Sequence, residues 1–280
     1  MTDSLEIRRL LDATCEIARE AGRAILDVYG RADFAVTRKS DNSPLTEADR
    51  VAHGIISRAL AELDPALPVL SEESAPTDHA TRRKWTRYWL VDPLDGTKEF
   101  LKRNGEFTVN IALVDEHRAV LGAVHAPVLD RMYFGHVMFG AWRSEGAGQP
   151  QSIAVRNAGS PLKVVGSRSH PSPELAAYLA RLPPHEITDM GSSLKICLVA
   201  EGAADVYPRL GPTSEWDTAA AQAILESAGG RMIDLAGRPL RYNSKDDLLN
   251  PHFLAFGDQQ RDWLEPIQST SDRQDRHRGF

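Results

Sequence analysis

Hydrophobic residues in the first part of the chain recur with the spacing of amphipathic helices. This spacing predicts helices over residues 4–29 and 46–63. The polar stretch between them, residues 31–45, is typical of a loop. Thr46 and Asp49 have the spacing of a capping box at the start of the second helix, which gives Asp49 a purely structural explanation.

Short runs of strand-forming residues follow, and turn-rich segments separate them. Strands are expected at residues 69–70, 89–91, 107–114, 120–125, 132–137, 162–165, 204–207, 232–233 and 253–256. Further helices are expected at residues 173–181, 192–201 and 216–228, and a basic loop at 81–87. The three runs between residues 107 and 137 indicate an antiparallel meander, because only short polar turns separate them.

Strands and helices in both halves of the chain predict an α+β protein of stacked sheet and helix layers. A stretch rich in glycine and polar residues precedes residue 151, and we expect two lobes on either side of it. The N-terminal α+β lobe would cover residues 1–157 and the C-terminal α/β lobe residues 158–267. Residues 268–280 are polar and charged, and we expect this tail to be disordered.

Composition narrows the class of protein. The 280 residues are 42% hydrophobic and 26% charged, as in an ordinary soluble globular protein, and the net charge of −6 gives no global basic signature for nucleic acid. No apolar run approaches the roughly 18 residues that span a bilayer, and the N-terminus does not resemble a signal peptide. Cys15 and Cys197 lie in apolar runs that suit reduced thiols, so we expect a cytoplasmic protein with no integral membrane segment.

The expected strand at residues 89–91 ends in an unusual turn. Asp92 and Asp95 bracket a proline that stiffens the turn, and Gly96 and Thr97 follow. Two like charges about 4 Å apart cost roughly 4 kcal/mol at an effective dielectric constant near 20, so such a pair needs a cation. The amides of Gly96 and Thr97 could cradle a phosphate. An ordinary turn with a helix N-cap explains the same residues equally well.

Three further acids become relevant if they reach this turn: Asp49, Glu72 and Asp217. Each also has a plainer explanation, since Glu72 could be a solvated surface glutamate and Asp217 could occupy the first turn of a helix. Sequence spacing does not establish that the five acids converge.

Glu72, the run from Asp92 to Thr97, and Trp216 with Asp217 resemble the signature of the inositol monophosphatase superfamily of magnesium-dependent, lithium-sensitive phosphatases. The resemblance covers residues 5–260, and it implies a layered αβαβα sandwich of the sugar-phosphatase type. Residues 95–100, 104–113 and 191–195 are similar to the CysQ branch, the 3'(2'),5'-bisphosphate nucleotidases. Inositol phosphatases more typically carry Thr-Asn where this chain has Lys98 and Glu99.

The branch converts adenosine 3',5'-bisphosphate to AMP and phosphate, and the resemblance implies this activity in sulfur metabolism. The 2',5' isomer and 3'-phosphoadenylyl sulfate are further candidate substrates. Two or more Mg²⁺ ions would be bound per chain. Glu72, Asp92 and the carbonyl of Leu94 would hold the first ion, and Asp92, Asp95 and Asp217 the second. Oxygen ligands suit this hard cation.

The resemblance also implies roles at the substrate. Asp49 and Thr97, with Glu72, would activate the attacking water. Ser192, Lys195, Arg209 and His170 are expected beside the nucleotide, although lysine and arginine are usually solvated surface residues. The full set expected to contact substrate is Glu72, Leu94, Asp95, Gly96, Thr97, His170, Ser192, Lys195, Arg209 and Asp217.

Alternatives remain open at this point. The same metal site could serve an inositol monophosphatase or a fructose-1,6-bisphosphatase. The chain could also be a non-catalytic regulatory binding protein, or its acids could form a purely structural cation site. The resemblance is compatible with a monomer or a homodimer, and with peripheral association at the cytoplasmic face of the inner membrane.

Overall fold

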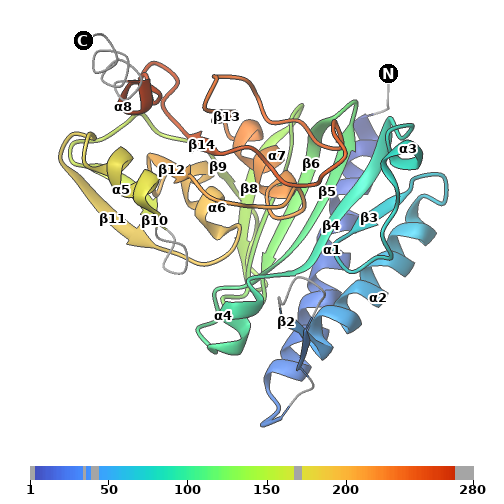
Figure 1. Cartoon of the computed structure of the whole chain (residues 1–280). Coiled ribbons are helices and arrows are strands. Elements are labelled where there is room, and N and C mark those ends of the chain that lie inside the picture. Colours follow the sequence, from blue (N-terminus) through green and yellow to red (C-terminus); the bar gives the residue numbers. More distant parts are fainter. Residues whose placement is uncertain (1–3, 34–35, 39–43, 167–171, 269–280) are drawn as a thin grey trace.

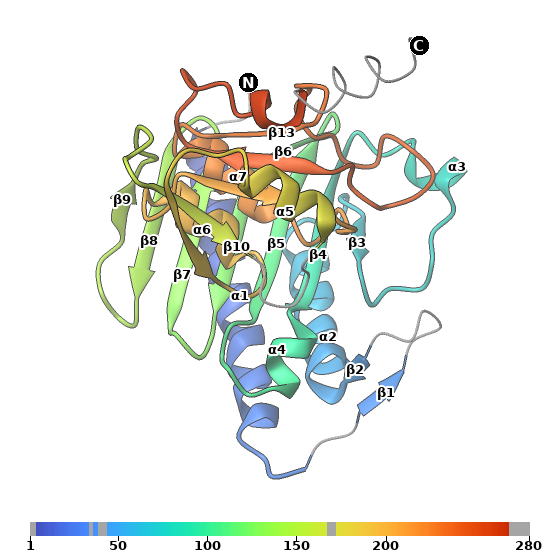
Figure 2. The same cartoon turned by 60° about the vertical axis from the view of Figure 1, so that its left-hand side comes forward.

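Two β-sheets dominate the computed structural model, which describes residues 4–33, 36–38, 44–166 and 172–268 (Figures 1 and 2). In this part of the chain the larger sheet has seven strands, in the order β3-β4-β5-β6-β7-β8-β9, and only β3 and β4 pair in parallel. Its strands are β3 (Val69–Ser71), β4 (Arg87–Asp95), β5 (Thr108–Asp115), β6 (Arg118–Ala126), β7 (Arg131–His136), β8 (Gly140–Glu145) and β9 (Gln151–Ile153).

Among the described residues, the smaller sheet has five strands in the order β11-β10-β12-β14-β13. Strand β10 pairs in parallel with both of its neighbours, and β14 pairs antiparallel with β12 and β13. Its strands are β10 (Leu162–Gly166), β11 (His185–Asp189), β12 (Val206–Arg209), β13 (Arg231–Asp234) and β14 (Phe253–Phe256). A separate pair, β1 (Val36–Arg38) and β2 (Pro44–Thr46), precedes α2.

Helices fill the remaining layers. The helices are α1 (Ser4–Tyr29), α2 (Glu47–Leu63), α3 (His79–Arg82), α4 (Thr97–Leu101), α5 (Pro173–Leu179), α6 (Leu194–Ala200), α7 (Ala219–Ser227) and α8 (Glu265–Gln268). Helices α1 and α2 cover one face of the seven-stranded sheet, and α6 and α7 pack between the two sheets. Helix α5 packs on the other face of the small sheet. The order of layers confirms the expected αβαβα sandwich.

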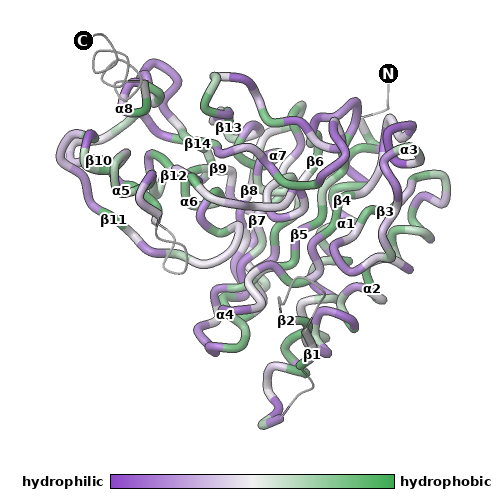
Figure 3. Tube along the Cα trace, in the orientation of Figure 1, coloured by the Kyte–Doolittle hydropathy of each residue, from purple (hydrophilic) through white to green (hydrophobic). Residues whose placement is uncertain are grey.

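Strand β4 illustrates how the sequence pattern builds these layers. Trp89 and Val91 are buried against α1 and α2, whereas Tyr88 and Leu90 are buried on the α7 side, as alternation along a strand requires. Figure 3 colours the chain by hydropathy and shows hydrophobic positions within strands and helices and hydrophilic positions around α3. The strand is buried on both faces because helices cover both.

Helix α7 lies unusually close to the seven-stranded sheet at Gly122 in β6. A Cβ atom placed on Gly122 would lie 2.0 Å from the backbone carbonyl oxygen of Ala220. No side chain fits in that space, so the absence of a Cβ at this position sets the depth at which α7 packs.

The structure confirms the helix over residues 4–29 and the meander between residues 107 and 137, and it corrects three details. The expected loop at 31–45 contains the β1–β2 pair, and the expected basic loop at 81–87 begins with the end of α3. Strands β8, β9 and β11 were not expected, and β11 is largely exposed and so carries no apolar alternation.

The proposed division into lobes at residues 157 and 158 stays a prediction. Residues 269–280, which make up nearly all of the expected tail, lie outside the described residues.

Candidate metal and phosphate site

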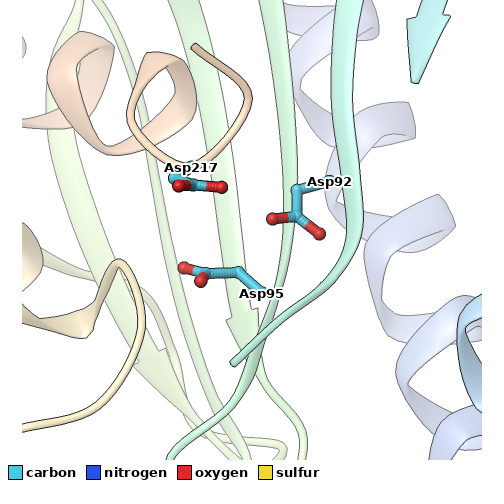
Figure 4. Close-up of side chains that lie close together, drawn as sticks. All are labelled: Asp92, Asp95 and Asp217. Carbon is cyan, nitrogen blue, oxygen red and sulfur yellow. The ribbon is translucent and has the colours of Figure 1, made fainter. Parts of the chain in front are cut away.

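A β-bulge near the end of β4 brings Asp92 and Asp95 to the same face of the sheet. Asp92 is paired with Asn110 of β5 and Asp95 with Thr108, so three steps along β4 match two steps along β5. Residues three apart on a regular strand point to opposite faces. The extra residue in β4 offsets this alternation by one position, and both carboxylates therefore face the same side (Figure 4).

Asp217 approaches the same point from the loop before α7. Its Oδ2 accepts a hydrogen bond of 2.9 Å from the backbone N–H of Ser214. The helix predicted from Trp216 begins only at Ala219, with Thr218 as its N-cap. The explanation of Asp217 as a first-turn residue is therefore wrong, and its carboxylate faces Asp92 and Asp95 instead (Figure 4).

The three aspartates form a compact acidic cluster. Each offers a carboxylate oxygen, and these atoms all lie within 4.8 Å of one another. Asp92 is only 1% exposed. Burial, followed by the negative charges of Glu72, Asp95 and Asp217, raises the pKa of Asp92 well above its usual value. Burial and the charges of Asp95 and Glu72 raise the pKa of Asp217 to about 8.

This donor set fits a hard divalent cation. The cluster holds carboxylate oxygens only, and like charges at this separation repel one another by roughly 4 kcal/mol per pair at an effective dielectric constant near 20. Carboxylate oxygens that converge from different segments are the ligands preferred by Mg²⁺. The residues present therefore fit the expected Mg²⁺.

Glu72 and Leu94 flank the cluster. Glu72 follows β3, and its backbone N–H donates to the carbonyl of Val91. Its charge contributes to the raised pKa values of Asp92 and Asp217, although it does not belong to the compact set of three. Leu94 lies in the bulge, where its N–H donates to Oδ1 of Asp92 at 3.0 Å. Direct ligation by Glu72 and by the Leu94 carbonyl stays a prediction.

Asp49 has the structural role that its spacing predicted. Its Oδ2 accepts hydrogen bonds from the backbone N–H of Thr46 at 2.7 Å and from the Thr46 hydroxyl at 2.5 Å, which confirms the capping box of α2. Asp49 is 2% exposed, and its charge also raises the pKa of Asp92. It therefore lies near the acidic cluster, and a second role in catalysis with Thr97 stays a prediction.

A cavity of about 300 Å³ opens beside the cluster and gathers most of the predicted site residues. It is lined by Asp95, Gly96, Thr97, Ser192, Lys195, Arg209 and Asp217, together with Tyr207, Phe253 and others. Its lining therefore combines carboxylates with the cationic side chains of Lys98, Lys195 and Arg209. Glu72 and Leu94 do not line it, and His170 lies outside the described residues.

Lys195 and Ser192 are held tightly in this wall. Lys195 is 8% exposed, and its ammonium donates to the carbonyl of Ser192 at 2.5 Å and lies 5.6 Å from the centre of the Tyr207 ring. Burial lowers the pKa of Lys195 to about 8. Ser192 has a φ of 47°, and its buried hydroxyl has no hydrogen-bond partner among the described residues. A strained residue with an unpaired hydroxyl suits a ligand contact.

Sequence reasoning missed three polar residues behind Asp95. Thr108, Asn110 and Ser193 are buried and hydrogen bonded to one another or to Asp95. A signal existed, because Asn110 interrupts an otherwise apolar strand and a buried asparagine in such a strand requires partners. The pairing of Ser193 with residues some 85 positions earlier could come only from the tertiary structure.

Comparison with known proteins identifies the family. The model of the inositol monophosphatase family matches residues 6–267. The chain belongs to the inositol monophosphatase family. Within the family, it is 52% identical over 245 residues to the 3'(2'),5'-bisphosphate nucleotidase CysQ of Escherichia coli K12, covering 87% of this chain and 98% of the relative. The CysQ of Haemophilus influenzae is 38% identical, with 92% and 97% covered.

Solved structures agree with this family assignment. The crystal structure of CysQ from Bacteroides thetaiotaomicron, titled a bacterial member of the inositol monophosphatase family, matches with a TM-score of 0.80 and 44% identity, covering 90% of this chain and 98% of that one. The IMPase of Thermotoga maritima matches with a TM-score of 0.76 at 23% identity, which supports the fold alone. Among the described residues of this family member, no helix combines the length and apolarity needed to cross a membrane.

Mg²⁺ binding to this site is expected to release protons at neutral pH. An Asp217 carboxyl with a pKa of about 8 is largely protonated at pH 7 without metal, and it must ionise to bind a cation. The apparent Mg²⁺ affinity should therefore rise from pH 6 to about 8 and then level off. Calorimetry at one pH in buffers of different ionisation enthalpy measures the release. Mg²⁺ binding without proton uptake by the buffer at pH 7 would contradict this.

Proposed function

We propose that this chain is a Mg²⁺-dependent phosphatase that converts adenosine 3',5'-bisphosphate to AMP and phosphate, with the 2',5' isomer and 3'-phosphoadenylyl sulfate as further substrates. One observation carries the proposal: a single cavity is lined by two members of the acidic cluster, Asp95 and Asp217, and by Lys195 and Arg209. A bisphosphate has two anionic groups: cations held by the aspartates would bind one, and Lys195 and Arg209 would bind the other. The names of the similar CysQ proteins, 3'(2'),5'-bisphosphate nucleotidase, support this substrate class.

The metal-binding half of the proposal rests on the acidic cluster. Glu72, Asp92 and the carbonyl of Leu94 would hold one Mg²⁺, and Asp92, Asp95 and Asp217 a second. Cations held there supply a lowered pKa for an attacking water and neutralise charge on the phosphate oxygens. Asp92 would contribute to both sites. It is buried, and the charges of Glu72, Asp95 and Asp217 all help to raise its pKa.

The remaining chemistry falls to groups of the chain itself. Asp49 and Thr97 would orient the water and receive its proton, and Glu72 would assist them. The N–H groups of Gly96 and Thr97 would hold the phosphate that is removed. Gly96 has a φ of 95°, a conformation that glycine adopts without strain, and this conformation allows α4 to start directly after the bulge.

The other phosphate and the nucleoside would lie beside Ser192, Lys195 and Arg209. Lys195 and Arg209 would pair with the retained phosphate, and the unpaired hydroxyl of Ser192 would donate to the ligand. Arg209 is anchored there by hydrogen bonds to Thr213 and to the carbonyl of Pro212. A contact between His170 and the nucleotide is proposed from the sequence resemblance alone.

A substrate panel on the purified protein tests the proposed function. With Mg²⁺ present, phosphate release from adenosine 3',5'-bisphosphate is expected to exceed release from inositol 1-phosphate and fructose 1,6-bisphosphate, and Li⁺ should inhibit it. A preference for inositol phosphate would replace the proposed substrate with the family's other one. Metal-dependent melting without any hydrolysis would favour a structural cation site.

Replacing Arg209 by alanine is expected to weaken discrimination between a bisphosphate and a monophosphate. The KM for adenosine 3',5'-bisphosphate should rise about tenfold, the usual cost of losing a hydrogen bond to a charged group, while the KM for 3'-AMP changes little. Arg231→Ala, an exposed arginine that does not line this cavity, is the matched control. An equal rise for both substrates would place Arg209 outside the recognition of the retained phosphate.

We further propose that the enzyme acts in the cytoplasm in sulfur metabolism, as a monomer or a homodimer. Sedimentation of the purified protein distinguishes the two oligomeric states.

A further inference from the structure

A buried polar network lies behind Asp95 and joins it to the wall of the cavity. Oδ2 of Asp95 accepts hydrogen bonds from the backbone N–H of Ser193 at 2.6 Å and from the side-chain amide of Asn110 at 3.3 Å. Oδ1 of Asn110 in turn accepts from the hydroxyls of Thr108 at 2.9 Å and Ser193 at 2.8 Å. Thr108, Asn110 and Ser193 are 0%, 1% and 3% exposed.

The network fixes which way the Asn110 amide points. The carboxylate of Asp95 accepts hydrogen bonds, so the NH₂ group of Asn110 faces Asp95 and the amide oxygen faces the hydroxyls of Thr108 and Ser193. The flipped amide would put its oxygen against the carboxylate oxygen of Asp95 and lose the hydrogen bond between them. Both donors to Asp95 fall on Oδ2, and Oδ1 accepts no hydrogen bond from the residues that the structure describes.

Polar side chains occupy buried positions of β5 where apolar side chains would be more favourable for packing. On β5, Thr108 and Asn110 share a face with Ala112 and Val114, which are buried in the core between the sheets. Apolar side chains would continue that core without the cost of burying polar groups. The network therefore has a purpose other than packing, and its one charged member is Asp95.

We propose that Asn110, Ser193 and Thr108 are positioning residues: Asn110 and Ser193 engage Oδ2 of Asp95, Thr108 orients Asn110, and Oδ1 of Asp95 is left for a divalent cation. The proposal rests on the cation site of the proposed function and extends it to residues that do not touch the cation. Ser193 belongs to the same turn as Ser192 and precedes Lys195 by two residues, so the network also fixes the cavity wall relative to the acidic cluster.

Mg²⁺ affinity without substrate is the decisive measurement, by calorimetry on the full chain. Asn110→Ala is expected to raise the Mg²⁺ dissociation constant about tenfold, the usual effect of losing a partner that orients a metal ligand. Thr108→Val should raise it several-fold, and Thr108→Ser, which keeps the hydroxyl, should restore it. Thr14→Val makes the same change at a residue of α1 that is also 0% exposed and whose hydroxyl donates to Leu10 of the same helix, and it should leave the dissociation constant unchanged.

Folding is checked separately from affinity. Melting in EDTA identifies variants that are folded, and if Asn110→Ala is not, the comparison of Thr108→Val with Thr108→Ser decides alone. A folded Asn110→Ala or Thr108→Val protein with an unchanged Mg²⁺ dissociation constant would overturn the proposal. A wild-type protein that binds Mg²⁺ but prefers another phosphate ester would contradict the proposed substrate and leave the positioning network intact.

Discussion

Asp92→Asn is expected to lower phosphate release about a thousandfold while raising the melting temperature of the metal-free protein. Asparagine keeps the oxygen that accepts the N–H of Leu94, so the bulge should survive. The substitution removes the negative charge that both proposed Mg²⁺ ions share. Since a bound cation contributes several kcal/mol of transition-state stabilisation, and about 1.4 kcal/mol corresponds to a factor of ten, a thousandfold loss is the expected scale.

The gain in stability comes from the same lost charge, which is unfavourable in the metal-free protein. Without metal, Asp92 is repelled by Glu72, Asp95 and Asp217 and loses solvation on burial, which is why its pKa is raised. A neutral side chain removes this cost. We expect an increase of about 2–4 °C in EDTA at pH 8.5, where the wild-type cluster is more fully ionised, corresponding to about 1 kcal/mol in a domain of this size. Added Mg²⁺ should then stabilise the wild type more than the variant.

Two results would contradict this interpretation. A lower melting temperature in EDTA would mean that the Asp92 charge is compensated in the metal-free protein. Near-normal phosphate release would remove Asp92 from the proposed metal site. A variant that loses phosphate release but keeps its cellular phenotype would favour the regulatory binding protein over the enzyme.

Gly122→Ala is expected to destabilise the protein by about 3 kcal/mol, at the upper end of the usual cost of overpacking. The new Cβ would lie 2.0 Å from the carbonyl oxygen of Ala220, and backbone atoms cannot move aside as a flexible side chain can. Helix α7 must therefore shift away from β6. Because Asp217 lies directly before α7, the shift should also weaken Mg²⁺ binding in the protein that remains folded.

Gly54→Ala is the matched control for this substitution. Gly54 is an exposed residue within α2, and a Cβ there meets no other atom within 4 Å. Alanine should stabilise the helix by about 0.5–1 kcal/mol. Denaturant unfolding of both variants measures the difference. A Gly122→Ala protein as stable as the wild type would show that α7 can repack at no cost, and would contradict the role given to this close approach.

Several elements followed from local sequence alone. The amphipathic spacing of α1 is a strong signal because this helix buries one face, and the runs of strand-forming residues in β5, β6 and β7 are strong because these strands are largely buried. The capping box at Thr46 and Asp49 is equally local. In contrast, β11 is mostly exposed and α7 begins three residues later than expected, since turn residues before a helix can carry the same apolar pattern as the helix itself.

The sequence by itself determined the chemistry that is available: two aspartates around a stiff turn, a glycine beside them, and the family to which these residues belong. The tertiary structure decided the arrangement. A bulge in β4 turned Asp92 and Asp95 to one face, the loop before α7 added Asp217, and Ser193 closed the network around Asp95 from another layer. Pairing register and packing between layers depend on partners remote in the chain, and spacing along the sequence does not encode their distances.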